Sequence, residues 1–445
     1  MTAVNHPVRI LIVGGGYVGM YTALGLQRKL SRGAADITVV DPQSNMTYQP
    51  FLPEAAAGSV EPRHVVVPLR KVLRKCTVIT AAVTNISHAT KTATIQPVDG
   101  KAYKFSYDLL VVCPGSVSRI LPIPGLAENG VGFKTIGEAI YLRNHVLSRL
   151  DLAASITDPS QRRRVLTFLF VGGGYAGVEA LAELQDMARY ALRYVRNVDE
   201  REMRWILIEA ASRIMPEVSV RLSSYTVDRL TERHIDVRLN TRLDSAVGGH
   251  MKLSDGEEFD AETLVWTAGV KANPMLEDTD LPRDDKGRLH CAANLTVKGV
   301  TGVFAAGDCA AVPDLTKDDP NAMLGPSAQH AVRQAKVLAS NVASAVRGGV
   351  LRDYRHAYAG SVASLGLYRG VAEIYGIKLR GPIAWFMHRT YHVSRMPTLN
   401  RKVRIVSDWT AALLFRREVV SLGQLQSPRY EFEEAAGTRK VPDIA

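Results

Sequence analysis

Two glycine-rich segments of this sequence have the residue types and spacing that bind phosphate. Each reads G-x-G-x-x-G, with Gly14, Gly16 and Gly19 in VGGGYVG, and Gly172, Gly174 and Gly177 in VGGGYAG. Such glycines let the backbone approach a pyrophosphate, whose charge is stabilised at the positive end of the following helix. One copy is a weak signal, because glycine-rich turns arise wherever a backbone needs positive φ. The duplication predicts two dinucleotide sites in one chain.

An acidic residue follows each segment at the end of a second apolar run. ITVV leads to Asp41, about 20 residues past the first motif, and WILIEA leads to Glu209 after a crossover longer by one or two helical turns. A carboxylate at this place hydrogen-bonds the ribose 2′-hydroxyl of an adenine dinucleotide. It would repel a 2′-phosphate, whereas Arg213 could attract one. The sequence favours NAD over NADP at the second site.

The elements around both motifs fit a strand, a turn and a helix. Val8 to Val13 and VLTFLFV precede the glycines, and YVGMYTALGLQRKL and VEALAELQDMARYAL follow them. Each nucleotide segment then continues into a hairpin with a DG turn and a buried strand, KTATIQPVDGKAYKFSYDLLVV and HMKLSDGEEFDAETLVW. VTGVFAAGDCAAV returns the chain to the first domain. This order predicts an α/β protein of two Rossmann-like dinucleotide-binding domains, the second inserted in the first.

The chain length allows roughly three parts at about 150 residues each. We expect a discontinuous first nucleotide domain at 1–125 and 288–375. The second domain is expected at 126–287, and a C-terminal amphipathic helical segment that lies on a membrane surface at 376–445.

The formal net charge of +11 is concentrated near the C-terminus. Residues 378–417 hold many lysines and arginines and one acid, Asp408, interleaved with aromatic residues such as Trp385, Phe386 and Trp409. No apolar run there reaches the roughly 20 residues that span a bilayer. Basic and aromatic residues on short helices are typical of a segment in the membrane interface, held by an anionic surface. The alternative is a helical hairpin that packs on the protein's own core or on a second subunit.

The N-terminal sequence and the cysteines indicate no further catalytic or metal-binding chemistry. The N-terminus enters a strand directly and shows no leader pattern, which predicts a cytoplasmic location. The four cysteines, Cys76, Cys113, Cys291 and Cys309, form no closely spaced pair. We interpret them as reduced structural thiols, and we predict no metal site.

Six motifs together resemble one family over nearly the whole chain. They are TYQPFLPEAAAGSV, YDLLVVCPGS, VGGGYAGVEALAEL, LVWTAGVKANP, VFAAGDCA and PSAQHAVRQAK. The sequence resembles the two-dinucleotide-binding flavoproteins and, through AQHA and the basic C-terminus, the type II NADH:quinone oxidoreductases. The resemblance implies FAD in the first domain, NADH in the second, and transfer of two electrons to a membrane quinone, menaquinone or ubiquinone, without proton pumping.

The resemblance also implies roles for individual residues. FAD would lie on Gly14, Gly16 and Gly19, with Asp41 on its ribose and the Gly307–Asp308 turn on its ribityl chain, and NADH would lie on Gly172, Gly174, Gly177 and Glu209. The turns at Gly115 and Gly269 would be cofactor-binding, and Gln49 and Pro50 would line the isoalloxazine. Glu179 would stand near the nicotinamide and flavin rings, and Ala328 and Gln329 on the quinone side.

Each of the last assignments has a plainer alternative. Glu179 could be a first-turn helix acid stabilised by the dipole, Gln329 a polar helix start, and Gly307–Asp308 a simple turn. The sequence also departs from the family pattern. Arg333 stands where a second Gln is expected, with Gln334 one place late, and Cys113 replaces a common Ala.

Three other functions share parts of this pattern. A sulfide:quinone oxidoreductase would need a reactive cysteine pair, for which Cys113 and Cys309 are the candidates. A soluble NAD(P)H-dependent flavoprotein reductase would need no membrane segment. A basic NAD-sensing flavoprotein would bind nucleic acid through its charge. We expect no nucleic acid partner, a peripheral place on the cytoplasmic face of the cell membrane, and leave a homodimer open.

Overall fold

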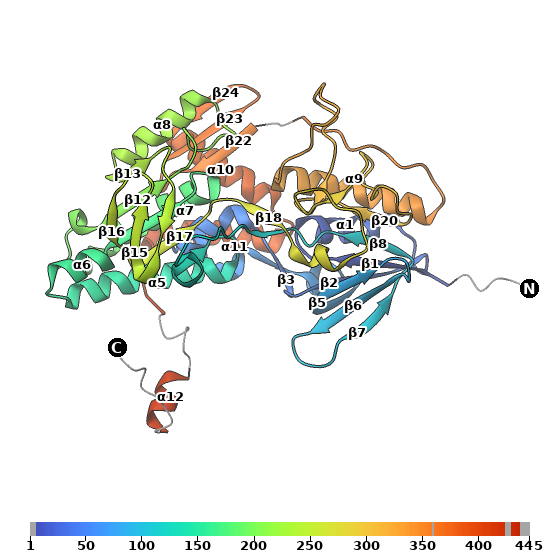
Figure 1. Ribbon diagram of the computed structural model, residues 1–445, viewed down its shortest axis with the longest axis horizontal. Coiled ribbons are helices and arrows are strands. Elements are labelled where there is room, and N and C mark those ends of the chain that lie inside the picture. The colour runs from blue at the N-terminus through green and yellow to red at the C-terminus, as the bar shows by residue number, and fades with distance from the viewer. Residues whose placement is uncertain (1–5, 358–359, 423–428, 437–445) are drawn as a thin grey trace, which may run out of the picture. The chain divides into compact units, whose positions relative to one another are not determined.

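The computed structural model describes residues 6–357, 360–422 and 429–436 (Figure 1). The chain forms two compact units, each built from three separate segments. Unit 1 contains Met1–Tyr48, Val66–Arg119 and Gly269–Ala359. Unit 2 contains Gln49–Val65, Ile120–Ala268 and Gly360–Ala445. The two nucleotide motifs therefore fall in different units, as the mixed α/β pattern of the sequence predicts.

Unit 1 is organised around a seven-stranded sheet with strand order β20-β8-β1-β2-β5-β6-β7 (Figure 1). Its strands are β1 (Val8–Val13), β2 (Ala35–Asp41), β5 (Thr77–Ser87), β6 (Thr92–Pro97), β7 (Tyr103–Ser106), β8 (Leu109–Val112) and β20 (Val303–Ala305). The strands from β20 to β5 are parallel, and β5, β6 and β7 form an antiparallel meander. The DG hairpin and the return to a buried strand at 109–112 are confirmed.

Helices α1 and α9 pack against each other beside this sheet (Figure 1). The helical elements of unit 1 are α1 (Tyr17–Lys29), α3 (Leu69–Val72), the 3₁₀ turn η5 (Pro274–Asp278) and α9 (Ala328–Val346). Short two-stranded ribbons complete the unit, namely β3 (Asn45–Thr47) with β4 (Val66–Pro68), β9 (Ser116–Ser118) with β18 (Val270–Ala272), and β19 (Leu289–His290) with β21 (Ala310–Ala311).

Unit 2 contains a five-stranded parallel sheet with order β10-β17-β11-β12-β13. Its strands are β10 (Gly130–Gly132), β11 (Thr167–Val171), β12 (Arg204–Ile208), β13 (Ile235–Arg238) and β17 (Thr263–Trp266). The strand β11 is buried along its whole length, as expected of a parallel strand covered on both faces. A separate antiparallel sheet holds β14 (Leu243–Ser245), β15 (His250–Leu253) and β16 (Glu258–Asp260). The second predicted hairpin is therefore confirmed.

The helices of unit 2 come from all three of its segments. They are η1 (Gln49–Phe51), α2 (Leu52–Ala56), η2 (Pro62–His64), α4 (Leu126–Asn129), α5 (Ile136–Ser155), α6 (Pro159–Val165), α7 (Tyr175–Ala191), η3 (Glu200–Glu202), α8 (Val220–Thr231), η4 (Val247–Gly249), α10 (Gly381–Arg395), α11 (Leu399–Phe415) and α12 (Tyr430–Ala435). A three-stranded antiparallel sheet of β22 (Gly360–Ser364), β23 (Gly370–Ile374) and β24 (Ile377–Arg380) precedes α10.

The boundaries of the units differ from the expected domain ranges at 49–65, 120–125, 269–287 and 360–375, and the C-terminal segment does not form a separate unit. Residues 49–65 belong to unit 2, because Leu52, Ala56 and Ala57 join the apolar core formed with α5 and α7. Residues 269–287 belong to unit 1, because β18 pairs with β9. Residues 120–125 and 360–375 were expected in the first domain but belong to unit 2, where β22 and β23 pack against α10. Helices α10 and α11 also belong to unit 2, so the expected C-terminal segment is not separate. These are long-range contacts that no local sequence pattern specifies.

The C-terminal helices are partly core and partly surface. Ala384, His388 and Arg389 of α10 and Ile405 of α11 are buried, whereas Leu414 and Phe415 are 69% and 84% exposed. Among the described residues, no helix combines the length and the apolar character needed to cross a membrane.

Candidate functional site

The first glycine motif forms the turn between β1 and α1. Gly14 has φ of +102°, which glycine tolerates, and a side chain there would collide with the carbonyl of Cys113. A side chain at Gly19 would collide with the carbonyl of Gly14. Gly16 differs, because a Cβ at that position would have no heavy atom within 4 Å. The first and third glycines therefore allow close packing, and the middle one keeps space open.

That open space lies at an uncapped helix start. Gly16 is the N-cap of α1 and makes no side-chain cap, whereas α5 begins with the complete capping box of Thr135 and Glu138. The first amides of a helix need acceptors, and a bound phosphate supplies them when no side chain does. The β1–α1 turn therefore fits the pyrophosphate of a dinucleotide.

Asp41 is fixed beside this turn at the end of β2. Its two carboxylate oxygens accept hydrogen bonds from the backbone nitrogens of Gly15 and Gln43, both at 2.6 Å. Burial raises the pKa of Asp41, and the two backbone hydrogen bonds partly offset that rise. The structure brings Asp41 to the middle of the motif, where the sequence places an acid for the ribose.

The second motif repeats the same geometry in unit 2. Gly172 has φ of +111° and packs against the Thr267 backbone, and a side chain at Gly177 would collide with Gly172. Gly174 is again the uncapped start of its helix, α7, with no heavy atom within 4 Å of an added Cβ. Glu209 accepts hydrogen bonds from Gly173 N at 2.6 Å and Ala211 N at 2.8 Å. Its carboxylate occupies the same place relative to its motif as that of Asp41.

Arg213 is not positioned for a 2′-phosphate. Its guanidinium donates to the backbone carbonyls of Pro216 at 2.6 Å and Val218 at 3.3 Å. The geometry of this site therefore agrees with the preference for NAD that Glu209 indicates.

Two side chains form hydrogen bonds with the Gly307–Asp308 turn in unit 1. Asp308 accepts a hydrogen bond from Ser116 Oγ at 2.6 Å, and the backbone nitrogen of Gly307 donates to Gln334 Oε1 at 2.7 Å. Gln334 is buried on α9. The glutamine that the sequence places one position late thus holds the turn that carries Asp308, and Arg333 donates to the Gln329 carbonyl within the helix at 3.0 Å.

Gly115 and Gly269 both have positive φ and open space at Cβ. They precede β9 and β18, whose antiparallel register sets them at opposite ends of one ribbon. The structure therefore does not bring these two glycines together.

The quinone-side candidates Ala328 and Gln329 begin α9. Ser327 caps the helix, its Oγ accepting from Gln329 N at 3.1 Å. The Gln329 Oε1 lies 3.1 Å from His356 Nε2, and His330 Nδ1 lies 2.9 Å from the Tyr354 hydroxyl. Burial lowers the pKa of both histidines. These partners follow Gln329 at no recognisable spacing, so no sequence pattern predicts them.

Gln49 and Pro50 lie in unit 2, where Gln49 Nε2 donates to the Lys134 carbonyl at 3.3 Å. They therefore belong to a different unit from the Gly14 motif.

Glu179 lies one turn inside α7 and is buried, so it is not the first-turn acid of the plainer alternative. Its Oε1 accepts from Ser364 N at 2.8 Å and lies 3.2 Å from His388 Nε2. Burial alone would lower the pKa of His388, but the hydrogen bond and charge of Glu179, with the charge of Glu54, raise it. Burial and the nearby His388 lower the pKa of His392 far below its usual value.

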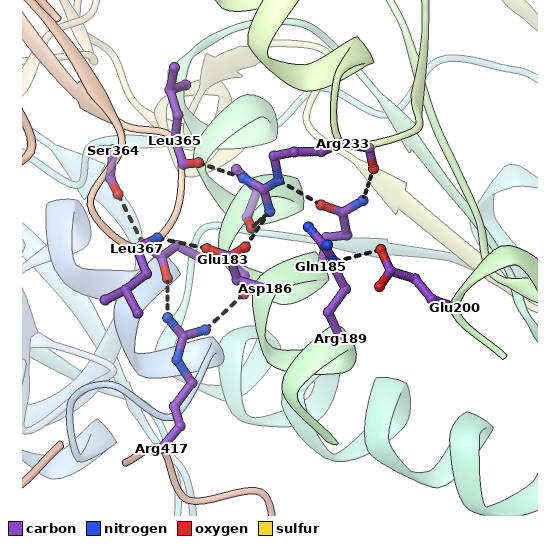
Figure 2. Close-up of polar contacts among 11 residues, drawn as sticks. Glu183, Gln185, Asp186, Arg189, Glu200, Arg233, Ser364, Leu365, Leu367 and Arg417 are labelled. Atoms are coloured by element: carbon purple, nitrogen blue, oxygen red, sulfur yellow. Dashed lines mark hydrogen bonds and ion pairs between the residues drawn. The ribbon is translucent and has the colours of Figure 1, made fainter. Parts of the chain in front are cut away.

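Further along α7 a buried polar network joins the C-terminal strands and helices (Figure 2). Glu183 accepts from Ser364 Oγ at 2.9 Å and lies 3.4 Å from Arg417 Nη2. Burial raises the pKa of Glu183, and Arg417 opposes the rise. A second carboxylate, Glu54, meets Arg389 at 3.1 Å and the Trp409 indole at 2.7 Å. Arg389 and Arg417 belong to the basic stretch 378–417 that is expected at a membrane surface, but both pair with buried acids.

Cys113 and Cys309 lack the environment of a nucleophilic thiol. Cys113 and Cys309 are buried free thiols, and burial raises the pKa of Cys309 to about 12 and that of Cys113 well above its usual value. Nucleophilic thiols instead have lowered pKa values and access to solvent.

The comparisons with known proteins identify relatives over most of the chain. The model of the pyridine nucleotide-disulphide oxidoreductase family matches residues 8–335. A type II NADH:quinone oxidoreductase of Mycobacterium tuberculosis is 28% identical over 423 residues, which cover 92% of this chain and 89% of that protein.

Two solved structures show the same fold. NDH2 of Plasmodium falciparum in complex with NADH aligns with a TM-score of 0.84 at 17% identity, over 93% of this chain and 99% of that one. The sulfide:quinone oxidoreductase of Aquifex aeolicus aligns with a TM-score of 0.68 at 16% identity, over 92% and 96%. These two proteins differ in the electron donor that their names give, NADH or sulfide, so the shared fold alone does not assign the donor and the residues of the site must do so.

Proposed function

We propose, from the premise that this chain belongs to the pyridine nucleotide-disulphide oxidoreductase family, that it is a type II NADH:quinone oxidoreductase. The observation that carries the proposal is the repetition of one nucleotide cradle in each unit. Each cradle has an open middle glycine, an uncapped helix and a carboxylate held by the backbone of the turn. Two such sites suit an enzyme that holds two dinucleotides at once.

We assign FAD to unit 1 and NADH to unit 2. In unit 1 the amides after Gly16 bind pyrophosphate, Asp41 binds the ribose, and Asp308, held by Ser116 and the Gln334-supported turn, binds the ribityl chain. In unit 2 the amides after Gly174 and the carboxylate of Glu209 bind NADH. When bound, FAD supplies a hydride acceptor that can pass two electrons to a quinone.

The chain mainly orients the reactants. The carboxylate of Glu179 is fixed by Ser364 N and His388, so it offers a rigid acceptor on α7 for the nicotinamide end of NADH. Gln49 and Pro50 are proposed to line the isoalloxazine, and Gly115 and Gly269 to admit the cofactors closely. On the quinone side, Gln329 and its partner His356 are proposed to hold a quinone oxygen.

The thiols argue against sulfide as the electron donor. That chemistry needs a thiolate near the flavin, whereas burial disfavours the thiolate of both Cys113 and Cys309. We expect slow alkylation of the native protein by iodoacetamide at pH 8, with fast alkylation after unfolding. Stoichiometric alkylation of Cys113 or Cys309 in the folded protein, with loss of quinone reduction, would favour the sulfide enzyme.

The acceptor site is tested by two glutamines of α9. Gln329→Leu removes a side chain proposed to meet quinone, and Gln334→Leu removes the acceptor of Gly307 N. We expect Gln329→Leu to leave flavin reduction by NADH unchanged and to slow reoxidation by quinone roughly tenfold or more, for a loss of about 1 to 3 kcal/mol. Gln334→Leu should instead weaken FAD retention. Stopped-flow traces in which Gln329→Leu slows the NADH step alone would place the acceptor elsewhere.

We further propose that the protein lies peripherally on the cytoplasmic face of the cell membrane through α10 and α11. Exposed Leu399, Leu414 and Phe415 supply apolar contacts, and the basic residues around them favour an anionic surface. A second copy of the chain covering this face is the alternative.

Truncation after Ile377 would be a poor test of this surface, because it removes the partners of Glu54 and Glu179. Replacing Leu399, Leu414 and Phe415 by Ser leaves the partners of Glu54 and Glu179 in place. We expect this variant to keep its flavin and its NADH reaction but to lose flotation with anionic liposomes. The control is Val220→Ser with Val247→Ser, which are exposed residues of the same unit. Undiminished flotation would refute the assignment, and a dimer-to-monomer change would favour the second copy.

Two remaining expectations can be tested on the same preparations. Proteoliposomes turning over NADH and quinone should develop no membrane potential. A DNA mobility assay should show no shift at physiological salt, whereas a nucleic-acid-binding flavoprotein would give a strongly salt-dependent one.

A further inference from the structure

A cavity of about 1010 Å³ lies within unit 2, separate from the residues assigned to NADH. Its walls come from α7, the turn between β22 and β23, α10 and α11. None of the glycines or acids of the nucleotide motif lines it. The cavity is therefore not part of the proposed NADH site.

The arginines that line the cavity, here called its charged wall, make the lining strongly positive. Six arginines line the cavity, against the two acids Asp186 and Glu200. Three of them already have a carboxylate partner: Arg189 with Glu200 at 2.6 Å, Arg389 with Glu54 at 3.1 Å and Arg417 with Glu183 at 3.4 Å. For the other three, Arg193, Arg369 and Arg416, no ion pair is found among the residues that the structure describes. The cavity thus carries positive charge that the chain itself does not neutralise.

The lining also contains apolar and aromatic side chains, here called its apolar wall. They are Trp385, Phe386, Val406, Trp409 and Leu413. Phe386 and Leu413 are 64% and 70% exposed, so the apolar wall continues to the protein surface. The Arg389 guanidinium lies over the rings of Trp385 and Trp409, at 4.1 and 4.8 Å from their centroids, where the charged and apolar walls meet.

The charged wall is held rigidly by the network of Figure 2. Arg233 donates to the Leu365 carbonyl and to Asp186, and Asp186 in turn accepts from Leu367 N at 2.6 Å. These bonds fix the turn that carries Leu367 and Arg369 against α7. A cavity whose wall is fixed by buried ion pairs is preformed, which lowers the entropic cost of binding.

We propose that this cavity binds one anionic phospholipid, with its phosphate among Arg193, Arg369 and Arg416 and an acyl chain along Trp385, Phe386 and Leu413. A neutral quinone would leave the three arginines without a counter-charge. A free phosphate would leave the apolar wall uncovered. A phospholipid matches both walls, and its second chain can leave through the exposed apolar rim. This site rests on the proposed membrane association of α10 and α11 and names the lipid class that it takes, and it does not depend on electron transfer.

The test is native mass spectrometry of the delipidated full chain with its flavin. Dioleoyl phosphatidylglycerol, dioleoyl phosphatidylcholine, glycerol 3-phosphate and inorganic phosphate are added separately. One phosphatidylglycerol should bind at least tenfold more tightly than phosphatidylcholine and than either small phosphate. Each arginine near an anionic headgroup is worth about fivefold, so Arg193→Gln with Arg369→Gln and Arg416→Gln should weaken phosphatidylglycerol binding by roughly 100-fold.

A matched control separates the cavity from general surface charge. Arg395→Gln, Lys402→Gln and Arg404→Gln remove the same charge from α10 and α11 outside the cavity lining, and they should change binding less than threefold. The proposal is overturned if both triple variants lose binding equally, or if phosphatidylcholine binds as tightly as phosphatidylglycerol. Equal binding of inorganic phosphate would show a free-anion site instead and would also overturn it. Reduction of the bound flavin by NADH, measured on the same samples, reports separately on the proposed function.

Discussion

Gly174 offers the sharpest test of the nucleotide cradle in unit 2. Its φ of −71° and ψ of 177° suit any L-residue, and an added Cβ has no heavy atom within 4 Å. Gly177, three residues on, is the matched control, because a Cβ there collides with the Gly172 carbonyl and lies 2.5 Å from Thr267 Oγ1. The two substitutions add the same methyl group to open space and to packed space.

The two variants should differ in how far they change the free energy of unfolding and the Kd for NADH. In Gly174→Ala, alanine is a poorer N-cap residue than glycine, which lowers the free energy of unfolding by roughly 0.5 to 1 kcal/mol. Alanine also makes the unfolded chain less flexible, which raises the free energy of unfolding by about 0.4 to 1 kcal/mol. The free energy of unfolding should therefore hardly change. The methyl group would displace a phosphate from at least one amide, and a charged hydrogen bond contributes about 1.5 to 3 kcal/mol, so the Kd for NADH should rise roughly 10- to 150-fold. Gly177→Ala should instead cost about 1 to 3 kcal/mol of stability through overpacking.

The assay is anaerobic reduction of the flavin at increasing NADH, beside thermal unfolding of each variant. Gly174→Ala should keep the parental Tm within about 2 °C and lose NADH affinity, whereas Gly177→Ala should lower the Tm by roughly 2 to 10 °C. Parental NADH affinity in Gly174→Ala would refute the placement of pyrophosphate at this helix start. An unfolded Gly174→Ala would refute the claim that the space is open.

Three further predictions concern unit 2. Glu209→Ser with Ala211→Arg should raise kcat/KM for NADPH relative to NADH by about tenfold or more, because the carboxylate that repels the 2′-phosphate is removed and a cation is added. An unchanged ratio of kcat/KM for NADPH to that for NADH would exclude Glu209 from ribose binding. Burial, with a smaller effect of the Arg149 charge, lowers the pKa of His145 to about 4. The neutral form is therefore favoured in the fold, and stability present above pH 6.5 is lost as the pH falls, by about 2 kcal/mol at pH 5. In urea unfolding at pH 7.5 and 5, the free energy of unfolding should fall less between the two pH values for His145→Asn than for the parent. An equal fall for both proteins would contradict this prediction. Arg233→Met removes a side chain that is only 4% exposed and leaves Asp186, whose side chain is 12% exposed, without its partner, which should cost about 3 to 5 kcal/mol. Arg229→Met removes a side chain that is 37% exposed and should cost under about 1 kcal/mol in the same denaturant titration.

The local elements were predictable because their signals are local. Glycine spacing, an apolar strand before it and an acid after the next strand specify the β1–α1–β2 and β11–α7–β12 units. Both hairpins with DG turns were predicted for the same reason. The basic and aromatic pattern of 378–417 also indicated helices, and α10 and α11 lie there. The membrane role of those helices and the cofactor roles of the site residues stay predictions.

The sequence by itself determined two nucleotide cradles, their acids and the α/β order of the chain, because each depends on residues close in sequence and on backbone conformations that few residue types allow. Only the tertiary structure decided which segments share a core. In the tertiary structure, residues 49–65, β22 and β23 belong to unit 2. Arg389 and Arg417 pair with the buried acids Glu54 and Glu183. The side chain of Gln334 accepts a hydrogen bond from Gly307 N. A buried charge is stable only when a partner reaches it, and that partner can lie hundreds of residues away, as Arg389 does from Glu54. No periodicity or motif records such a pairing, because it is set by the packing of the whole unit.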